Sequence, residues 1–316
     1  MTLKSTLAGI LVAGSLAGAL AGGAQAQTLG IGTMGQGTSG YSMGSAIAKV
    51  LADNGVNALV QPSAGTSAYL PLIDMGELDL GIANAIEVAE AMTGTGVFEG
   101  KQLANIAPAA RLYPFHVGVF VRDDSGIETI ADLAGKSVTY GYTSQVTINR
   151  VVDAILASAE LSEADVTPVM VPNVVRGAED FAAGRADGAF FAIGSGKVTE
   201  TDAAVGGLHF VPVPDDEASV ARLQEIVPQA YVTTIEPADN RTGVDEAMPV
   251  MAYDYMLVVG AHVPEETVGE IVTILRDNAD VLAESFGGFR GMDPDDMIVD
   301  IGVPYHPGAV AALGDN

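Results

Sequence analysis

Short apolar runs alternate with amphipathic stretches along almost the whole chain, and this alternation most restricts the folds open to it. Strand-like runs are expected at 29–33, 56–60, 78–84, 137–141 and 188–193, and each is followed by a segment with helical spacing. Strands that alternate with helices are typical of α/β domains with a largely parallel sheet. We therefore predict an α/β fold.

One local pattern occurs twice. "MGELDLGIAN" (75–84) and "AAGRADGAFFAIG" (182–194) each end a helix at glycine, pass through an aspartate into an apolar strand, and finish on a small or polar residue. The 316 residues also exceed the usual size of a single core. Two similar α/β lobes would explain both observations. In open α/β sheets, ligands bind at the carboxyl ends of the strands, where helix N-termini present free N–H groups.

The first 26 residues have the features of a secretory signal. A single cation, Lys4, precedes an apolar run that ends on Ala24-Gln25-Ala26, the small residues that signal peptidase needs. The apolar run is shorter than the roughly 20 residues of a membrane-spanning helix. We therefore expect residues 1–26 to be a signal peptide that is cleaved after Ala26, which would place the mature protein in the periplasm.

Composition excludes several classes of function. The chain has no cysteine, which removes disulfide and thiolate chemistry, and its 40 acids against 14 bases give a net charge of −26. Such a surface repels nucleic acid and anionic membranes. The four histidines (116, 209, 262 and 306) show no metal-ligand spacing. We expect neither a metal nor a cofactor.

The stretch from Gly30 to Gly35 matches G-x-G-x-x-G, the fingerprint of dinucleotide-binding loops. After the expected cleavage, only residues 27–29 would remain to form the strand that must precede such a loop. We therefore interpret the match as a tight turn into a helix and not as a cofactor site.

Candidate ligand contacts lie where strand-like runs end and helices begin, because hydroxyl, amide and backbone N–H groups gather there. The candidates are Thr33, Gln36, Thr38, Ser39 and Tyr41 in the first turn, Ser63, Gly65, Thr66 and Ser67 in the second, Asn84 at a strand tip, Thr143, Ser144, Gln145 and Thr147 in a turn of the second lobe, and Arg150 and Gly194. For the residues of the 142–147 turn, helix capping alone, with Thr143 or Ser144 as the cap, is an equal alternative.

Few cations are available to hold an anionic ligand. Arg150 could bind a carboxylate or could instead pair with Asp153. Arg111 and Arg176 are further candidates, but Arg111 lies next to "LYP" near the expected junction of the lobes, which favours a structural ion pair.

Five stretches of the chain resemble the TRAP-associated extracytoplasmic immunogenic (TAXI) type of solute receptor. They are "IGTMGQGTSGYSMGSAIAKVL", "QPSAGTSAYLPLIDMGELDLGIAN", "LYPFHVGVFVRDDSGIETIADLAGKSVTYG", "FAAGRADGAFF" and "PYHPGA". The resemblance implies a type II periplasmic-binding-protein fold with two lobes joined by crossing strands. We expect lobe 1 at 28–118 plus 232–316 and lobe 2 at 119–231, with crossings near 117–122 and 231–235.

The resemblance also implies a function. A monomeric receptor would capture a small organic anion, a carboxylate or an amino acid, and deliver it to a tripartite ATP-independent periplasmic (TRAP) permease. The alternatives are an ABC-importer receptor of the same fold and a secreted hydrolase or lyase. An enzyme would require a base beside a nucleophile, and the sequence shows no such arrangement.

Overall fold

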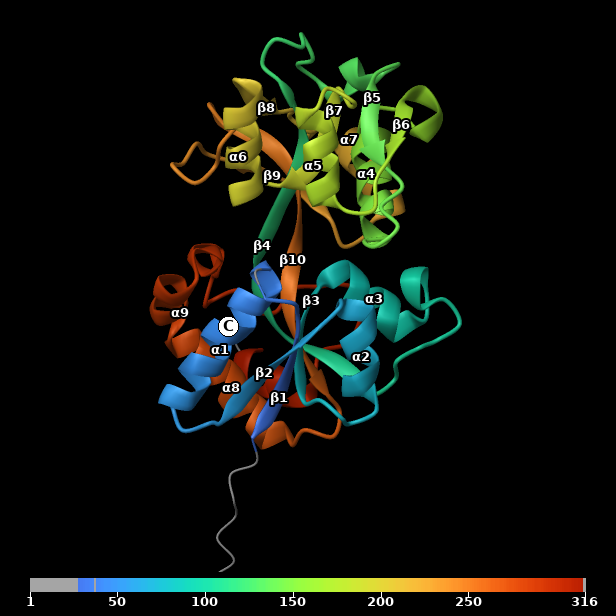
Figure 1. Cartoon of the computed structure of the whole chain (residues 1–316). Coiled ribbons are helices and arrows are strands. Elements are labelled where there is room, and N and C mark those ends of the chain that lie inside the picture. Colours follow the sequence, from blue (N-terminus) through green and yellow to red (C-terminus); the bar gives the residue numbers. More distant parts are fainter. Residues whose placement is uncertain (1–27, 37, 315–316) are drawn as a thin grey trace, which may run out of the picture.

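The computed structural model describes residues 28–36 and 38–314 of the chain. They form two α/β lobes, the lower and the upper lobe of Figure 1, joined by the long strands β4 (Ile106–Arg122) and β10 (Met248–Gly260). The predicted α/β fold with two lobes and crossing strands is confirmed. The predicted signal peptide lies outside the described residues.

The two lobes share one ten-stranded sheet, whose main path runs β2-β1-β3-β10-β4-β7-β5-β6. β1 pairs in parallel with β2 and β3, and β5 pairs in parallel with β6 and β7, whereas β4 and β10 run antiparallel to their neighbours. The other strands are β1 (Leu29–Met34), β2 (Ala58–Ser63), β3 (Leu80–Asn84), β5 (Ser137–Tyr140), β6 (Thr167–Met170), β7 (Gly188–Ala192), β8 (Leu208–Phe210) and β9 (Tyr231–Ile235).

Helices cover both faces of each part of the sheet. The α-helices are α1 (Ser39–Asp53), α2 (Thr66–Asp74), α3 (Ala85–Thr93), α4 (Thr147–Ser158), α5 (Val174–Ala182), α6 (Gly196–Val205), α7 (Glu217–Ile226), α8 (Glu265–Asp277), α9 (Ala279–Ser285) and α10 (Pro307–Leu313). Short 3-10 helices lie at η1 (Gly96–Phe98), η2 (Ile130–Leu133), η3 (Glu163–Asp165) and η4 (Gly287–Gly291). Across residues 28–36 and 38–314, we find no helix with the length and apolar character needed to cross a membrane.

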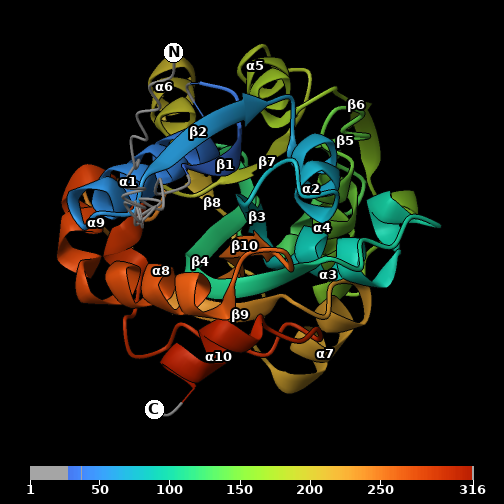
Figure 2. The same ribbon diagram turned by 90° about the horizontal axis from the view of Figure 1, so that it is seen from below.

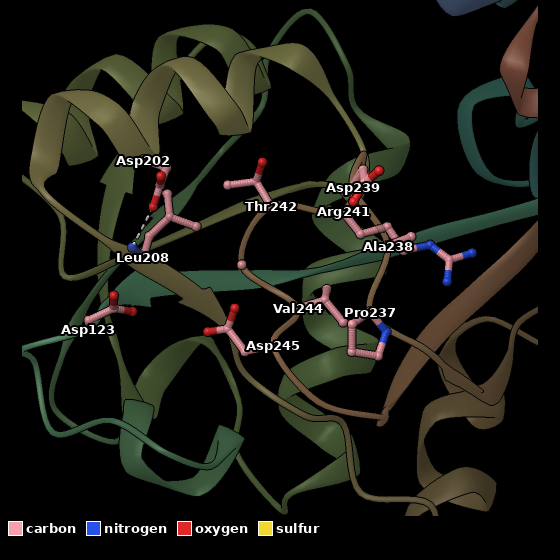
Figure 3. A pocket seen from close by; sticks show the side chains of 11 residues that line it. Asp123, Asp202, Leu208, Pro237, Ala238, Asp239, Arg241, Thr242, Val244 and Asp245 are labelled. Carbon is pink, nitrogen blue, oxygen red and sulfur yellow. Dashed lines mark hydrogen bonds between the residues drawn. The ribbon is translucent and has the colours of Figure 1, made fainter.

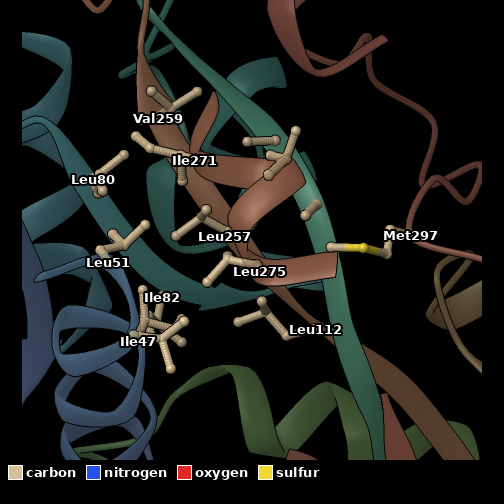
Figure 4. Close-up of a cluster of buried hydrophobic side chains, with 14 of the residues drawn as sticks. Ile47, Leu51, Leu80, Ile82, Leu112, Leu257, Val259, Ile271, Leu275 and Met297 are labelled. Atoms are coloured by element: carbon tan, nitrogen blue, oxygen red, sulfur yellow. The ribbon is translucent and has the colours of Figure 1, made fainter. Parts of the chain in front are cut away.

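Alternating side chains of β10 build two cores in the lower lobe. Leu257 and Val259 join the cluster formed with α1 and α8 (Figure 4), whereas Met256 and Val258 join the cluster formed with α2 and α3. Figure 2 shows α1 and α8 to one side of the lower sheet and α2 and α3 to the other. Successive residues of a strand point to opposite faces, so a central strand with apolar residues at every position is buried on both sides.

Alternating side chains of β4 likewise belong to two cores of the upper lobe. Val119 and Val121 pack into the cluster that contains α4, whereas Phe120 packs into the cluster that contains α5 and α6. The ring of Phe120 lies edge-on to Phe181 and Phe210, with centroids 4.9 and 5.7 Å away.

The sequence suggested that the chain returns to the lower lobe through residues 231–235. In the structure it returns through β10. β9 pairs antiparallel with the first part of β10, where Tyr231 lies opposite Ala252 and Ile235 opposite Met248. Because the chain folds back on itself between these two strands, it passes from the upper lobe to the lower lobe only after residue 252.

Two of the three glycines of the G-x-G-x-x-G match lie inside a strand, and only Gly35 lies in the predicted turn, where its carbonyl accepts from the N–H of Thr38 (3.3 Å). Gly30 and Gly32 both belong to β1. A Cβ atom on Gly32 would lie 2.8 Å from Cδ2 of Tyr69, so the glycine allows the α2 side chain to pack against the strand.

Candidate functional site

In each lobe the parallel strands end at the edge that faces the other lobe (Figure 1). Helices α1, α2 and α3 begin after β1, β2 and β3, and helices α4, α5 and α6 begin after β5, β6 and β7. The side chains of Thr38, Asn84, Asn173 and Ser195 cap α1, α3, α5 and α6. The starts of α2 and α4 have no side-chain cap. Among the described residues their first-turn N–H groups therefore have no side-chain acceptor. The N–H groups of Ala68, Ile148 and Asn149 donate to backbone carbonyls, which leaves those of the first residues of each helix, Thr66 and Thr147, for a ligand.

The first residues of these two uncapped helices meet at one carboxylate, that of Glu87 on α3. Thr147 Oγ1 at the start of α4 donates to Glu87 Oε1 (3.3 Å), and Asn84 Nδ2 donates to Glu87 Oε2 (2.7 Å). The hydroxyl of Thr66, the first residue of α2, acts on the same carboxylate and lowers its pKa. Glu87 thus joins groups from both lobes.

Burial raises the pKa of Glu87, and the hydrogen bonds from Thr66, Thr147 and Asn84 offset this only in part. The charged neighbour that contributes is Glu90, one turn along α3, and its negative charge raises the pKa of Glu87 further. The carboxylate of Glu87 is therefore held by neutral donors beside a second acid.

Glu90 forms the ion pair that links the lobes. Its Oε1 accepts from Arg150 Nη1 on α4, and its Oε2 accepts from the backbone N–H of Val97 (3.2 Å). Arg150 Nη2 donates to the carbonyl of Ile226 (2.6 Å). Arg150 therefore pairs with Glu90 across the lobe boundary and not with Asp153, the alternative that the sequence had left open.

Four aromatic side chains line one face of the crossing strands. The rings of Phe115 and Tyr255 lie 4.8 Å apart, those of Phe115 and Tyr253 5.6 Å, and those of Tyr113 and Tyr255 5.6 Å. Tyr255 lies opposite Asn84 in the pairing of β10 with β3. Burial raises the pKa of Tyr253 and of Tyr255, and the nearby charge of Glu87 raises both further. The aromatic face therefore adjoins Glu87 through Asn84, which lies opposite Tyr255 and donates to the Glu87 carboxylate.

The other face of the crossing strands carries a buried ion pair. Arg111 Nε donates to Asp254 Oδ1 (2.8 Å), and Arg111 Nη1 donates to Asp296 Oδ2 (2.7 Å). Tyr231 also donates to Asp254 Oδ1 (3.0 Å). Burial alone would lower the pKa of Arg111, but Asp254 and Tyr231 outweigh it and raise that pKa. Arg111 therefore has the structural role that its position in the sequence suggested.

A family comparison and the solved structures identify the fold of this chain. The model of the NMT1-like family matches residues 31–314. The chain belongs to the NMT1-like family. The periplasmic aliphatic sulphonate binding protein SsuA from Escherichia coli is 14% identical with a TM-score of 0.50, over 90% of this chain and 84% of that one. The GluR0 ligand-binding core in complex with L-glutamate is 13% identical with a TM-score of 0.50, over 85% of this chain and all (100%) of that one. This NMT1-like chain therefore has the periplasmic-binding-protein fold, as predicted.

The residues of this NMT1-like chain that were predicted to contact the ligand do not all lie at the lobe boundary. Thr33 is fully buried in β1 and its hydroxyl donates to the carbonyl of Met34 (3.0 Å), so we withdraw it from the predicted set. Neither Thr143 nor Ser144 caps α4, since the helix begins only at Thr147. The other candidates, for which solute contact stays a prediction, are Gln36, Thr38, Ser39, Tyr41, Ser63, Gly65, Ser67, Thr143, Ser144, Gln145 and Gly194.

Three site residues were missed by the sequence analysis: Glu87, Tyr253 and Tyr255. Glu87 lies within an ordinary helical pattern, "AIEVAEAM", and the tyrosines lie within a strand pattern. Only the pairing of β10 with β3 and the approach of α4 to α3 bring them together. The repeated "LDLGIAN" pattern did indicate Asn84, which anchors the cluster.

A hollow of about 510 Å³ lies on the upper lobe, away from Glu87 (Figure 3). Its lining includes Asp123, Asp202, Asp239 and Asp245, with Arg241 at one end. Among the residues that the structure describes, no three or more acids or histidines are grouped so that they could hold a metal ion.

His116 on β4 gives a prediction about stability and pH. Burial lowers its pKa to about 4, and the positive charge of Arg241 contributes in the same direction. The unfolded value is about 6.5. Because the folded pKa is the lower one, its stabilising contribution is complete above pH 6.5 and declines as the pH falls towards 4. The free energy of unfolding of the wild type should fall between pH 7 and pH 4.5. We expect this fall to be smaller in His116→Gln by about 1 to 2 kcal/mol.

Denaturant unfolding of both proteins at pH 7, 5.5 and 4.5 checks this expectation. His209→Gln is the matched control, since His209 lies on β8 and bonds Asp123. An equally steep pH dependence in wild type and His116→Gln would contradict the assignment.

Proposed function

We propose that this NMT1-like chain is an exported receptor that captures a small organic anion, a carboxylate or an amino acid, between its lobes. The observation that carries the proposal is the convergence of two uncapped helix N-termini, α2 from the lower lobe and α4 from the upper lobe, on one set of polar side chains. Helix N-termini attract anions through their free N–H groups and their dipole.

Neutral donors suit this task because the arginines near the lobe boundary are already paired. Arg111 binds Asp254 and Asp296, and Arg150 binds Glu90. A solute carboxylate would therefore bind the backbone N–H groups at Thr66 and Thr147, because the Thr147 hydroxyl already donates to Glu87. Since these residues belong to different lobes, capture would draw the lobes together.

The lobes would move as units about β4 and β10. We place the first boundary near residue 118, as the sequence suggested. For the return we favour a boundary after residue 252, because β9 pairs with the upper part of β10.

We further propose delivery of the solute to a TRAP-type permease, on the basis of the TAXI-like stretches of the sequence. An ABC importer is the alternative, since receptors of this fold also serve that class. Uptake by cells that carry the receptor with its permease separates the two. Loss of uptake when an ionophore collapses the ion gradient supports the TRAP type, and loss only when ATP is depleted supports the ABC type.

Binding should depend on one threonine from each lobe. We expect Thr66→Ala and Thr147→Ala each to weaken solute binding about tenfold or more, because each removes a hydroxyl that holds the charged Glu87 in the site, and a hydrogen bond to a charged group contributes about 1.5–3 kcal/mol. Isothermal titration with a hit from a thermal-shift screen of organic acids and amino acids measures the loss. Small-angle scattering should show contraction of the wild type with the same ligand.

Ser195→Ala is the control, because it removes the cap of α6 and no group of the site. Unchanged affinity in both threonine variants, or an unchanged radius of gyration at saturation, would refute capture between the lobes. Turnover of the bound compound would point to the enzyme alternative.

A further inference from the structure

Among residues 28–36 and 38–314 the carboxylate of Glu87 has no positively charged partner, although it lies at the centre of the candidate site. Its hydrogen-bond partners, Asn84, Thr66 and Thr147, are all neutral. We infer that Glu87, with the rings of Tyr253 and Tyr255, forms a subsite for a protonated amine of the solute. The inference rests on the proposed function and narrows its solute to a small zwitterion, a carboxylate that also carries an amine.

The charge balance of the site supports this assignment. A carboxylate that is largely removed from water is stable only when it is paired or fully hydrogen-bonded. Arg150, which lies one turn beyond Thr147 on α4, binds Glu90 and the carbonyl of Ile226. Glu87 and Glu90 together therefore outnumber the single guanidinium by one negative charge. A solute that brings a positive group restores the balance, whereas a purely anionic solute would add to the excess.

The aromatic face supplies the second observation. Tyr253 is only 6% exposed, and among residues 28–36 and 38–314 its hydroxyl has no hydrogen-bond partner. In that same part of the chain no fully buried side-chain oxygen lacks a partner, so this hydroxyl must reach solvent. Tyrosine faces attract cations, and their hydroxyls accept hydrogen bonds from ammonium groups. Tyr255 lies between Tyr253 and Tyr113, within the field of Glu87.

The two ends of such a solute would occupy different parts of the site. Its amine would donate to Glu87, and its carboxylate would accept from the uncapped starts of α2 and α4. Both groups would lie next to Thr66 and Thr147, which bind Glu87 from either lobe.

A neutral, protonated Glu87 that donates to a solute carboxylate is the competing interpretation, and isosteric substitution distinguishes the two. The probes are pairs of compounds that differ in one group: L-alanine and L-lactate, L-aspartate and L-malate, and L-phenylalanine and L-phenyllactate. Each is titrated into wild type, Glu87→Gln, Tyr253→Phe and Glu270→Gln. The last is the control, because Glu270 is an exposed acid on α8 outside the site.

We expect wild type to bind the amine member of at least one pair at least tenfold more tightly than its hydroxyl partner. Glu87→Gln should reduce that preference to less than threefold, Tyr253→Phe should reduce it in part, and Glu270→Gln should leave it unchanged. Circular dichroism confirms that each variant is folded.

Three results would overturn the inference. Tighter binding of the hydroxyl members would show an anion-only site and would leave the proposed function intact. An undiminished amine preference in folded Glu87→Gln would place the amine elsewhere. Binding of no compound from either series, with no contraction in scattering, would reject the inference together with the proposed function.

Discussion

Arg111→Met is expected to lower the free energy of unfolding by about 3 to 5 kcal/mol, because it removes one partner of a buried ion pair. Asp254 is 4% exposed, and its Oδ1 accepts from both Arg111 and Tyr231. Without the guanidinium, Asp254 would keep only the hydroxyl of Tyr231 as a donor. The loss is measured by denaturant unfolding at pH 7, where Asp254 of the variant would be a buried charge without its arginine partner.

Asp296→Asn is the matched control, since it removes the other acid that Arg111 binds. The side chain of Asp296 is 53% exposed, so its pairing contributes at most about 1 kcal/mol. Equal losses in the two variants would show that the crossing strands do not depend on the buried pair. A double variant, Arg111→Met with Asp254→Leu, should recover much of the stability, because it removes both charges at once.

Phe120→Ala should cost the protein about 3 to 5 kcal/mol of unfolding free energy, the usual loss when a large aromatic side chain leaves a closed core. Phe120 is fully buried, and its ring packs edge-on to Phe181 and Phe210. The empty volume cannot collapse easily, because at Phe120 β4 is paired with both β7 and β8.

Phe286→Ala tests whether burial, and not the loss of an aromatic ring as such, determines this cost. Phe286 lies at the end of α9 and is only partly buried, with its ring 6.1 Å from that of Phe289. Its truncation should cost less than half as much in the same unfolding experiment. Similar losses for both variants would contradict the central position of Phe120.

The alternation of apolar runs predicted the strands to within a few residues, because central strands of an α/β sheet are buried on both faces and leave a continuous apolar signal. The expected strand at 137–141 is Ser137–Tyr140, and the one at 188–193 is Gly188–Ala192. The return crossing was placed wrongly because both β9 and β10 read as strands. Nothing local indicates which of two consecutive strands pairs within one lobe and which continues into the next.

The candidate site was predictable only in part. Turn residues at strand ends indicated Thr66, Asn84 and Thr147, since polar groups at such ends are typical of ligand sites. Glu87 and Tyr255 were not predictable, because one belongs to a helix and the other to a strand that is distant in sequence. Their proximity follows from the register of β10 with β3, in which Tyr255 lies opposite Asn84. Such register is a tertiary property that no single segment specifies.

The position of β10 between β3 and β4 also determines when each lobe can fold. Most elements of the upper lobe lie between Phe115 and Tyr253, so most of their contacts join residues of one continuous segment of the chain. The lower sheet, in contrast, remains split until β10 inserts and α8 and α10 cover it. Chains that depend on contacts between distant segments fold slowly. The upper lobe should therefore be the first to acquire native structure, and a lower lobe synthesised only as far as β4 would expose an unpaired edge of β3 to other chains.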